Sequence, residues 1–383
     1  MFNFRKSPVI TDPLKIEKLL TRNVEEVFVK DNLREKLLSG KRLKIKLGFD
    51  PTGSKIHIGR AIVLRKLREF QDLGHEITFL VGDFTARIGD PSDKLEKRPM
   101  LDSKRIAENL RDYKRQVGMI VDLSKANFVY NNDWLSKLKF DEIAELAESF
   151  TVSQMIARRN FKDRLDKGDE ISLREFLYPL MQGYDSYVLK ADVEIGGFDQ
   201  LFNLKAGRIV QKHYGMREQN VIATIMLEGT DGRKMSTSWG NVINTTDDAQ
   251  QMYGKTMAVR DDLIVKYLKA CTDVSDEKIS EVEKDLANPS KNPRDAKMFL
   301  ARELVKVYHS EADAQKAEEN FVKTFQNKEG IPDDTEAVRV ESGKLLSDLL
   351  VEKQIVPSKT EFRRLVEAGA IKFAEGEDKI TDP

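Results

Sequence analysis

The chain has 383 residues, of which 40% are hydrophobic and 33% are charged, a composition typical of a globular protein with two or three domains. Basic and acidic residues total 64 each, so no overall charge attracts nucleic acid and any such binding must use local patches. One cysteine, Cys271, excludes internal disulfides and cysteine metal clusters, and no apolar run reaches the roughly 18 residues that cross a membrane. The N-terminus has no secretory pattern, so we expect a cytoplasmic protein.

The first elements along the chain alternate between strand and helix. The pattern predicts a strand over residues 43–49, a helix with one apolar face over 59–73, and a short apolar strand over 77–81. A strand, a helix and a strand in this order form a βαβ unit, which normally places parallel strands beneath covering helices. The sequence therefore predicts an α/β fold.

The middle of the chain interrupts this pattern and then resumes it. Residues 93–172 form a long, mostly helical stretch without a clear strand. Strands are then expected over residues 191–195 and 221–227, with a helix over 200–213 between them. We expect these strands to join the same parallel sheet.

A helix is expected to begin at Ser172, because Ser172 and Glu175 form a capping-box pattern. Pro179 should kink this helix, since it removes one backbone hydrogen bond. Three polar residues spaced by four and three positions share one face of it, namely Tyr178, Gln182 and Asp185. An ordinary amphipathic helix has fewer strongly polar groups beside its apolar residues, so this face predicts a binding site.

The C-terminal third is helical and polar. Helices are expected over residues 261–270, 276–286, 296–309 and 312–325. Residues 327–337 carry Gly330 and Pro332 and are typical of a linker. A separate small unit follows, with a further helix beginning near Ser358.

Polar motifs follow each of the four expected strands. They are Asp50 and His57, then Asp83 and Asp90, then Gly197, Asp199 and Gln200, and finally Lys234. In open α/β sheets, ligands bind beyond the carboxyl ends of the strands. Four motifs that are distant in sequence should therefore converge on one crevice.

Two of these motifs suit phosphate chemistry. His57 and Gly59 lie where a strand turns into a helix, and the helix N-terminus offers N–H groups to an anion. Lys234 begins the segment Lys234-Met235-Ser236-Thr237-Ser238, on a loop that contains Gly229 and Gly232. Either motif alone is more often an ordinary turn or a solvated loop. Their joint presence favours a nucleotide site.

With the segments 82–91, 178–185 and 196–200, these motifs resemble the HIGH and KMSKS signatures of class I aminoacyl-tRNA synthetases, and in particular bacterial-type tyrosyl-tRNA synthetases. The resemblance runs from about Leu43 to the C-terminus. It implies a Rossmann-like catalytic domain with a dimerisation insertion (residues 1–228), a helical anticodon-side domain (229–336) and a partial α+β RNA-binding domain (337–383). It also implies a homodimer that uses ATP with Mg²⁺, tyrosine and tRNA(Tyr), and no membrane.

The resemblance assigns roles residue by residue. The catalytic positions would be His57, Arg60, Lys234 and Thr237. ATP would meet Gly48, Asp50, His57, Gly59, Gly197, Asp199 and Lys234. Asp185 would accept the tyrosine hydroxyl, while the rest of the amino acid would meet Tyr178, Gln182, Asp90 and Gln200. The tRNA would meet Arg158, Arg159, Arg363 and Arg364, although a solvated basic face explains the first two arginines equally well.

Three positions depart from the family pattern. Arg60 replaces the second histidine of HIGH, Thr237 replaces the second lysine of KMSKS, and Lys46 stands where many bacterial relatives place a second tyrosine. Two alternatives therefore stay open. One is a tryptophanyl-tRNA synthetase, against which Asp185 argues because it suits a phenol. The other is a non-catalytic, synthetase-derived RNA-binding protein, against which the complete amino-acid pocket argues.

Overall fold

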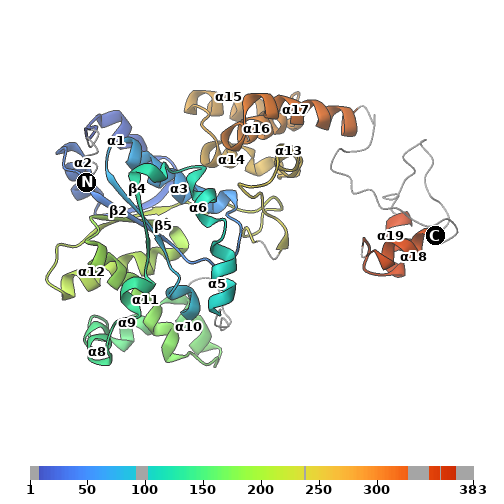
Figure 1. Ribbon diagram of the computed structural model, residues 1–383. Coiled ribbons are helices and arrows are strands. Elements are labelled where there is room, and N and C mark those ends of the chain that lie inside the picture. Colours follow the sequence, from blue (N-terminus) through green and yellow to red (C-terminus); the bar gives the residue numbers. More distant parts are fainter. Residues whose placement is uncertain (1–7, 92–101, 237–238, 327–344, 354, 368–383) are drawn as a thin grey trace. The chain divides into compact units, whose positions relative to one another are not determined.

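A computed structural model describes residues 8–91, 102–236, 239–326, 345–353 and 355–367 (Figure 1). The chain divides into two compact units, with the division between Ala314 and Gln315. Across the described ranges, no helix is both long enough and apolar enough to cross a membrane. The domain boundaries expected at residues 228 and 336 stay predictions.

The first unit is built on a sheet whose strands lie in the order β1-β6-β5-β2-β3-β4. Neighbouring strands are parallel, except that β1 runs antiparallel to β6 at one edge. The strands are β1 (Val24–Phe28), β2 (Lys44–Phe49), β3 (Glu76–Val81), β4 (Ala126–Tyr130), β5 (Val193–Gly197) and β6 (Asn220–Thr224). The four strands expected from the sequence are confirmed as β2, β3, β5 and β6.

Strand β4 corrects the expectation that residues 93–172 are helical and interrupt the sheet. It pairs in parallel with β3 and forms the other edge. Its central residue, Phe128, stacks on Phe79 of β3 with ring centroids 5.2 Å apart. The strand is only five residues long and partly exposed, so its stability comes from this neighbour rather than from an apolar pattern of its own.

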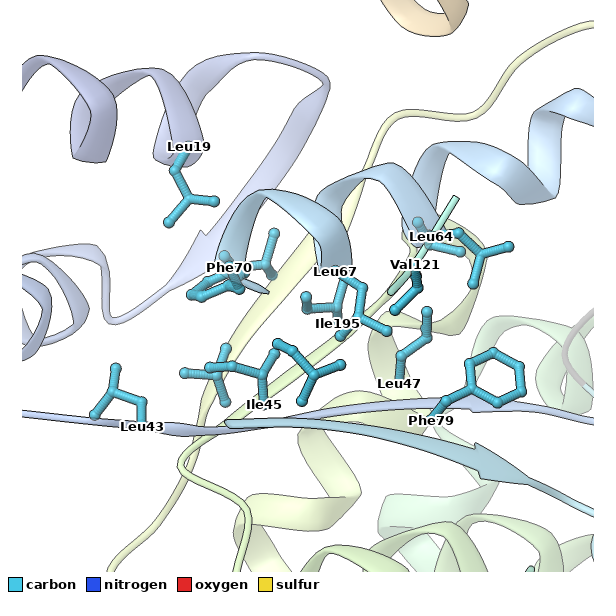
Figure 2. Close-up of a cluster of buried hydrophobic side chains, with 14 of the residues drawn as sticks. Leu19, Leu43, Ile45, Leu47, Leu64, Leu67, Phe70, Phe79, Val121 and Ile195 are labelled. Atoms are coloured by element: carbon cyan, nitrogen blue, oxygen red, sulfur yellow. The ribbon is translucent and has the colours of Figure 1, made fainter. Parts of the chain in front are cut away.

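Helix α3 (Ile58–Asp72) covers one face of the sheet and forms the main core. Its N-cap is His57, and Gly74 just beyond its end has a φ of 85°, which glycine adopts easily. Figure 2 shows Leu64, Leu67 and Phe70 of α3 pointing toward Ile45 and Leu47 of β2. All of these side chains are buried, and burying each one contributes about 1.5–3 kcal/mol to folding.

Helix α11 (Leu173–Leu189) packs beside α12 (Leu201–His213). The predicted capping box is confirmed, because the Ser172 backbone N–H donates to Glu175 at 3.0 Å and the Ser172 hydroxyl accepts from the helix. The helix continues through Pro179 as one element. A Cβ on Gly183 would lie only 2.6 Å from Val210 Cγ2 of α12, so glycine permits the close approach.

The other helices of the first unit flank the sheet or follow it. Before and around it lie α1 (Pro13–Thr21), α2 (Lys30–Leu38), α4 (Thr85–Ile88), α5 (Ser103–Leu110), α6 (Tyr113–Gly118), η1 (Leu123–Lys125), α7 (Asn132–Leu135), α8 (Phe140–Ala147), α9 (Val152–Ile156), α10 (Arg159–Asp166) and η2 (Phe198–Gln200). After it come α13 (Ala249–Met257), η4 (Asp261–Leu263), α14 (Ile264–Cys271), α15 (Asp276–Leu286) and α16 (Pro293–Tyr308).

The chain continues with α17 (Glu311–Phe321) and η5 (Val322–Gln326). The four helices expected after residue 260 are confirmed as α14, α15, α16 and α17. In the second unit, α18 (Leu346–Glu352) packs against α19 (Lys359–Glu367), and the expected helix start is confirmed by the Ser358 hydroxyl, which accepts from the Glu361 backbone N–H at 3.2 Å.

Candidate active site

Polar residues from separate strands meet at the carboxyl edge of the sheet. Asp50 follows β2, and its carboxylate accepts hydrogen bonds from the Thr85 hydroxyl at 2.7 Å and from the Tyr178 hydroxyl at 3.0 Å. Burial raises the pKa of Asp50 to about 7, with the nearby Asp90 and Asp185 carboxylates adding to the rise. These bonds bring together segments that lie up to 128 residues apart in sequence.

Asp185 lies on α11 and is buried, with 2% of its surface exposed. Trp134 Nε1 donates to its Oδ1 at 2.8 Å, and Asn131 Nδ2 donates to its Oδ2 at 3.2 Å. Burial raises its pKa to about 6, while the Lys46 charge and these two donors act in the opposite direction. Above that pH, Asp185 is a carboxylate that can accept a hydrogen bond from a buried hydroxyl.

Asn131 and Trp134 were not predicted as site residues, because both follow the unpredicted strand β4 (Ala126–Tyr130). Asn131 also donates to the Thr85 hydroxyl at 3.1 Å, which links the surroundings of Asp185 to Asp50. The Asn131-Asn132-Asp133 run is a turn signal, and it marks the end of a strand once β4 is recognised.

Asp90 forms a second acidic position and is 8% exposed. Its carboxylate accepts from Gln200 Nε2 at 2.7 Å and from Asn203 Nδ2 at 3.3 Å. The Arg158 guanidinium lies 3.9 Å away. Asp90 and Gln200 are thus brought together as predicted, and Asn203 is an addition from the structure.

The placement of Arg158 differs from the expected phosphate contact. Its side chain is 6% exposed, and its guanidinium lies 4.9 Å from the Phe202 ring and 5.5 Å from the Phe161 ring. A guanidinium enclosed by two rings and facing Asp90 is not accessible to an RNA phosphate. In contrast, the side chain of the neighbouring Arg159 is 95% exposed.

His57 and Gly59 contact the loop that carries Lys234. His57 Nδ1 accepts the Arg60 backbone N–H at 3.3 Å, which leaves the ring proton on Nε2. Burial and the charges of Arg60 and Lys234 lower the pKa of His57 to about 3, so the ring is neutral at physiological pH. A Cβ on Gly59 would lie 3.0 Å from Met235 Sδ, so the two signatures are packed together.

The Lys234 loop is organised by Asn241. This amide donates to Asp231 at 2.8 Å and to the Lys234 carbonyl at 3.1 Å, and it accepts from the Ser236 backbone at 2.8 Å. The Lys234 ammonium lies 3.8 Å from Asp199, and its side chain is half-exposed. Thr237 lies outside the described residues.

Arg60 is held within the site rather than directed to solvent. Its guanidinium donates to the Thr52 hydroxyl at 3.2 Å and to the Tyr113 hydroxyl at 3.5 Å. It also lies 5.9 Å from the Phe49 ring. Arg60 therefore fixes the turn that follows β2 and brings a permanent positive charge to it.

Two predicted glycines end strands at the same edge. Gly48 lies near the end of β2, and Gly197 ends β5. A Cβ on Gly197 would lie 2.7 Å from Asp199 Oδ1, so a larger residue would displace that carboxylate.

Among the described residues, no three acidic, histidine or cysteine side chains are grouped to hold a metal ion.

Comparison with known proteins agrees with this geometry. Residues 38–326 match the model for "tRNA synthetases class I (W and Y)". A tyrosine–tRNA ligase from Thermotoga maritima is 45% identical over 94% of this chain and 90% of its own length. The chain belongs to the tyrosyl-tRNA synthetase family. A second such ligase, from Carboxydothermus hydrogenoformans, is 44% identical over 97% of this chain and 92% of its own length.

Solved structures of tyrosyl-tRNA synthetases share the fold. A C-terminally truncated mitochondrial enzyme from Aspergillus nidulans superposes with a TM-score of 0.66 at 25% identity, covering 81% of this chain and 94% of that one. The Archaeoglobus fulgidus enzyme complexed with L-tyrosine gives 0.63 at 24% identity, covering 80% of this chain and all of that one. The Rossmann-like class I fold expected from the sequence is confirmed, and neither the tryptophanyl nor the non-catalytic alternative is favoured.

Proposed function

We propose that this chain is a tyrosine–tRNA ligase. In the first step, a tyrosine carboxylate oxygen bonds to the α-phosphorus of ATP, and the bond from that phosphorus to the bridging oxygen breaks, releasing pyrophosphate. In the second step, the tyrosyl group passes from AMP to the terminal ribose of tRNA(Tyr). The observation that carries the proposal is the buried Asp185 carboxylate, both of whose oxygens are fixed by neutral donors.

Tyrosine would lie between Asp185 and Asp90. The phenol would donate to Asp185, and the α-ammonium would meet Asp90, Gln182 and the Tyr178 hydroxyl. Burial raises the pKa of the Tyr178 hydroxyl well above its usual value, so it stays protonated and continues to donate to Asp50. Gln200 completes the support by holding Asp90 at 2.7 Å.

ATP with Mg²⁺ would bind as a substrate in the part of the crevice beside His57 and Lys234. The neutral His57 would donate from Nε2 to a phosphate oxygen, beside the N-terminus of the 15-residue helix α3. Lys234 would place its charge against the leaving pyrophosphate, while Gly48, Gly59, Gly197 and Asp199 would meet the nucleoside. Because the attacking carboxylate is already charged, positioning and electrostatic stabilisation can supply most of the rate.

The tRNA contacts are assigned to exposed arginines. Arg159 in the first unit and Arg363 in the second are both exposed, and exposed arginines bind phosphate oxygens through paired N–H groups. Arg364 already pairs with Glu361 at 2.6 Å, so we expect it to contribute less. Because tRNA charging accompanies protein synthesis, we place the enzyme in the cytoplasm.

A homodimer is proposed from exposed apolar side chains on helices α8, α9 and α11. Phe140, Val152 and Leu173 are 87%, 67% and 80% exposed in the single chain. A contiguous apolar patch marks an interface, and we propose that these three side chains contribute to one. Phe140→Glu should shift the protein from dimer to monomer in sedimentation velocity, whereas an unchanged dimer would place the interface elsewhere.

Pyrophosphate exchange tests the activation step. Purified protein with ATP and Mg²⁺ should incorporate labelled pyrophosphate into ATP when tyrosine is added, and much less when tryptophan or phenylalanine is added. Exchange with tryptophan alone, or with none of the three, would refute the proposal.

A further inference from the structure

A buried ion pair lies beneath the amino-acid site. Lys46 on β2 and Glu194 on β5 are direct neighbours in the parallel register of the sheet. The Lys46 Nζ lies 3.0 Å from Glu194 Oε1, and both side chains are 1% exposed. Helix α11, which carries Gln182 and Asp185, packs over the same face, because it contacts both members of the pair.

Every polar position of this pair is occupied. The three Lys46 protons have three acceptors, namely Glu194 Oε1, the Ser186 hydroxyl at 2.8 Å and the Gln182 carbonyl at 2.9 Å. Glu194 Oε1 also accepts from Gln182 Nε2 at 3.1 Å. Glu194 Oε2 accepts from Ser186 at 2.9 Å and from Gln219 at 2.5 Å. The network therefore leaves no donor of the ammonium unused.

Stability alone does not account for such a pair. Removing two charges from water costs several kcal/mol per ion, and apolar residues of similar size are often as stable or more so. A fully satisfied network does, however, fix the geometry of the groups around it. Two of those neighbours are the proposed tyrosine ligands Gln182 and Asp185.

The pair fixes the side-chain amide of Gln182. Its Nε2 is committed to Glu194 Oε1, and its backbone carbonyl is held by Lys46. With one amide N–H donated to Glu194, the Oε1 atom is left to face a ligand, and an α-ammonium requires an acceptor of that kind. A neutral partner at position 194 would let the amide flip and present donors to the ammonium.

The pair also acts on Asp185. The charged groups that face Asp185 are Lys46 from β2, which favours its ionised form, and Glu194 from β5, which opposes it. Asp50, which follows β2, is a further acidic neighbour, and the Asp185 charge raises its pKa. The remaining neighbours, Trp134 and Asn131, are neutral donors. The two members of the pair thus act on this carboxylate in opposite directions, while both hold the adjacent Ser186 hydroxyl in place.

We propose that Lys46 and Glu194 are a positioning pair for the tyrosine substrate, which orients the Gln182 amide as an acceptor for the α-ammonium and fixes the segment of α11 that carries Asp185. The inference rests on the proposed function, because tyrosine is the ligand it names. It also assigns a role to the lysine that replaces the second tyrosine of many bacterial relatives.

The kinetic test compares Lys46→Met with the neutral double variant Lys46→Met/Glu194→Gln. Each should raise the tyrosine KM about tenfold in pyrophosphate exchange with a smaller change in kcat, the loss expected for one charge-assisted interaction. The double variant should regain thermal stability over Lys46→Met, because no buried charge is left uncompensated. The matched control is Lys36→Met, which removes another buried lysine bound to Asn220 at 2.6 Å and should leave the tyrosine KM unchanged. If the double variant regains the wild-type KM together with its stability, the role is structural and the proposal is wrong.

A second readout needs no substrate. The chain has two tryptophans, so in a Trp239→Phe background the fluorescence reports Trp134, which donates to Asp185. The pH midpoint of that signal should move upward in Lys46→Met and stay in place in Lys36→Met. If Lys46→Met leaves the midpoint unmoved while the wild-type protein exchanges pyrophosphate with tyrosine, the positioning role of the pair is refuted and the proposed function stands. Absence of tyrosine exchange in the wild-type protein refutes the proposed function and the substrate named here.

Discussion

Trp134→Phe removes one hydrogen bond from the residue that we propose reads the tyrosine hydroxyl. The indole Nε1 lies 2.8 Å from Asp185 Oδ1, and phenylalanine keeps most of the ring volume without a donor. A hydrogen bond to a buried charged group contributes about 1.5–3 kcal/mol. Because this bond stabilises only the ionised carboxylate, its loss should raise the pKa of Asp185 by about one to two units.

The direction of the pH effect follows from the same bond. Burial already raises the pKa of Asp185 to about 6, while the Trp134 bond lowers it. The wild-type kcat/KM for tyrosine should therefore be lost as the pH falls through about 6. In Trp134→Phe that acid limb should move to about pH 7 or above, and kcat/KM at pH 7 should fall by about twofold to tenfold, because a smaller fraction of Asp185 is ionised.

Pyrophosphate exchange between pH 5.5 and 9 measures both quantities. Trp239→Phe is the matched control, since it makes the same change in the other tryptophan, which is 54% exposed, and its acid limb should stay near pH 6. An acid limb that is the same in Trp134→Phe and the wild type would show that Trp134 does not support an ionised Asp185 in the working enzyme.

Three further predictions concern folding and the phosphate site. Gly183→Ala should lower the free energy of unfolding by about 1–3 kcal/mol in urea, because the new Cβ would lie 2.6 Å from Val210 Cγ2 and 3.0 Å from the Ala206 carbonyl; an unchanged midpoint would mean that α11 and α12 can separate freely. Asp185→Asn should raise the free energy of unfolding at pH 8 by up to about 3 kcal/mol. The folded carboxyl has a pKa of about 6 against a usual 3.8, so its charged form destabilises the folded state at pH 8. A gain in stability at pH 4 and none at pH 8 would contradict this reasoning. Arg60 and Thr237 are predicted to compensate for each other. Arg60→His should slow tyrosine activation, and adding Thr237→Lys should restore much of that rate. If the two effects simply add in this double-mutant cycle, the residues act independently.

The sheet could be predicted where each strand is buried on both faces. Strands β2, β3, β5 and β6 are mostly buried, each carries apolar residues that indicate a strand, and their order with the helices gives parallel pairing. The edge strands β1 and β4 carry no such signal, since β1 is mostly half-exposed and β4 depends on aromatic contact with β3. Their recognition required the neighbours that only the folded chain supplies.

The candidate site could be predicted only for residues on recognisable motifs. Asp50, His57, Asp90, Asp185 and Lys234 follow strands or share a helix face. Partners that act through folded proximity could not be found this way.

Trp134 is one such partner, because it follows the missed strand. Glu194 is another, since its pairing with Lys46 depends on the strand register. The side chain of Arg158 fills a buried position between two rings, which a basic run in the sequence does not distinguish from a solvated surface.

The central claim is that Asp185 selects tyrosine by accepting its hydroxyl. The most direct measurement is kcat/KM for tyrosine and for phenylalanine in pyrophosphate exchange, in the wild type and in Asp185→Asn. Asparagine keeps the shape but removes the charged acceptor, so tyrosine should lose about tenfold to a hundredfold while phenylalanine, which makes no such bond, changes little. Equal losses for both amino acids, or unchanged tyrosine kinetics, would contradict the account.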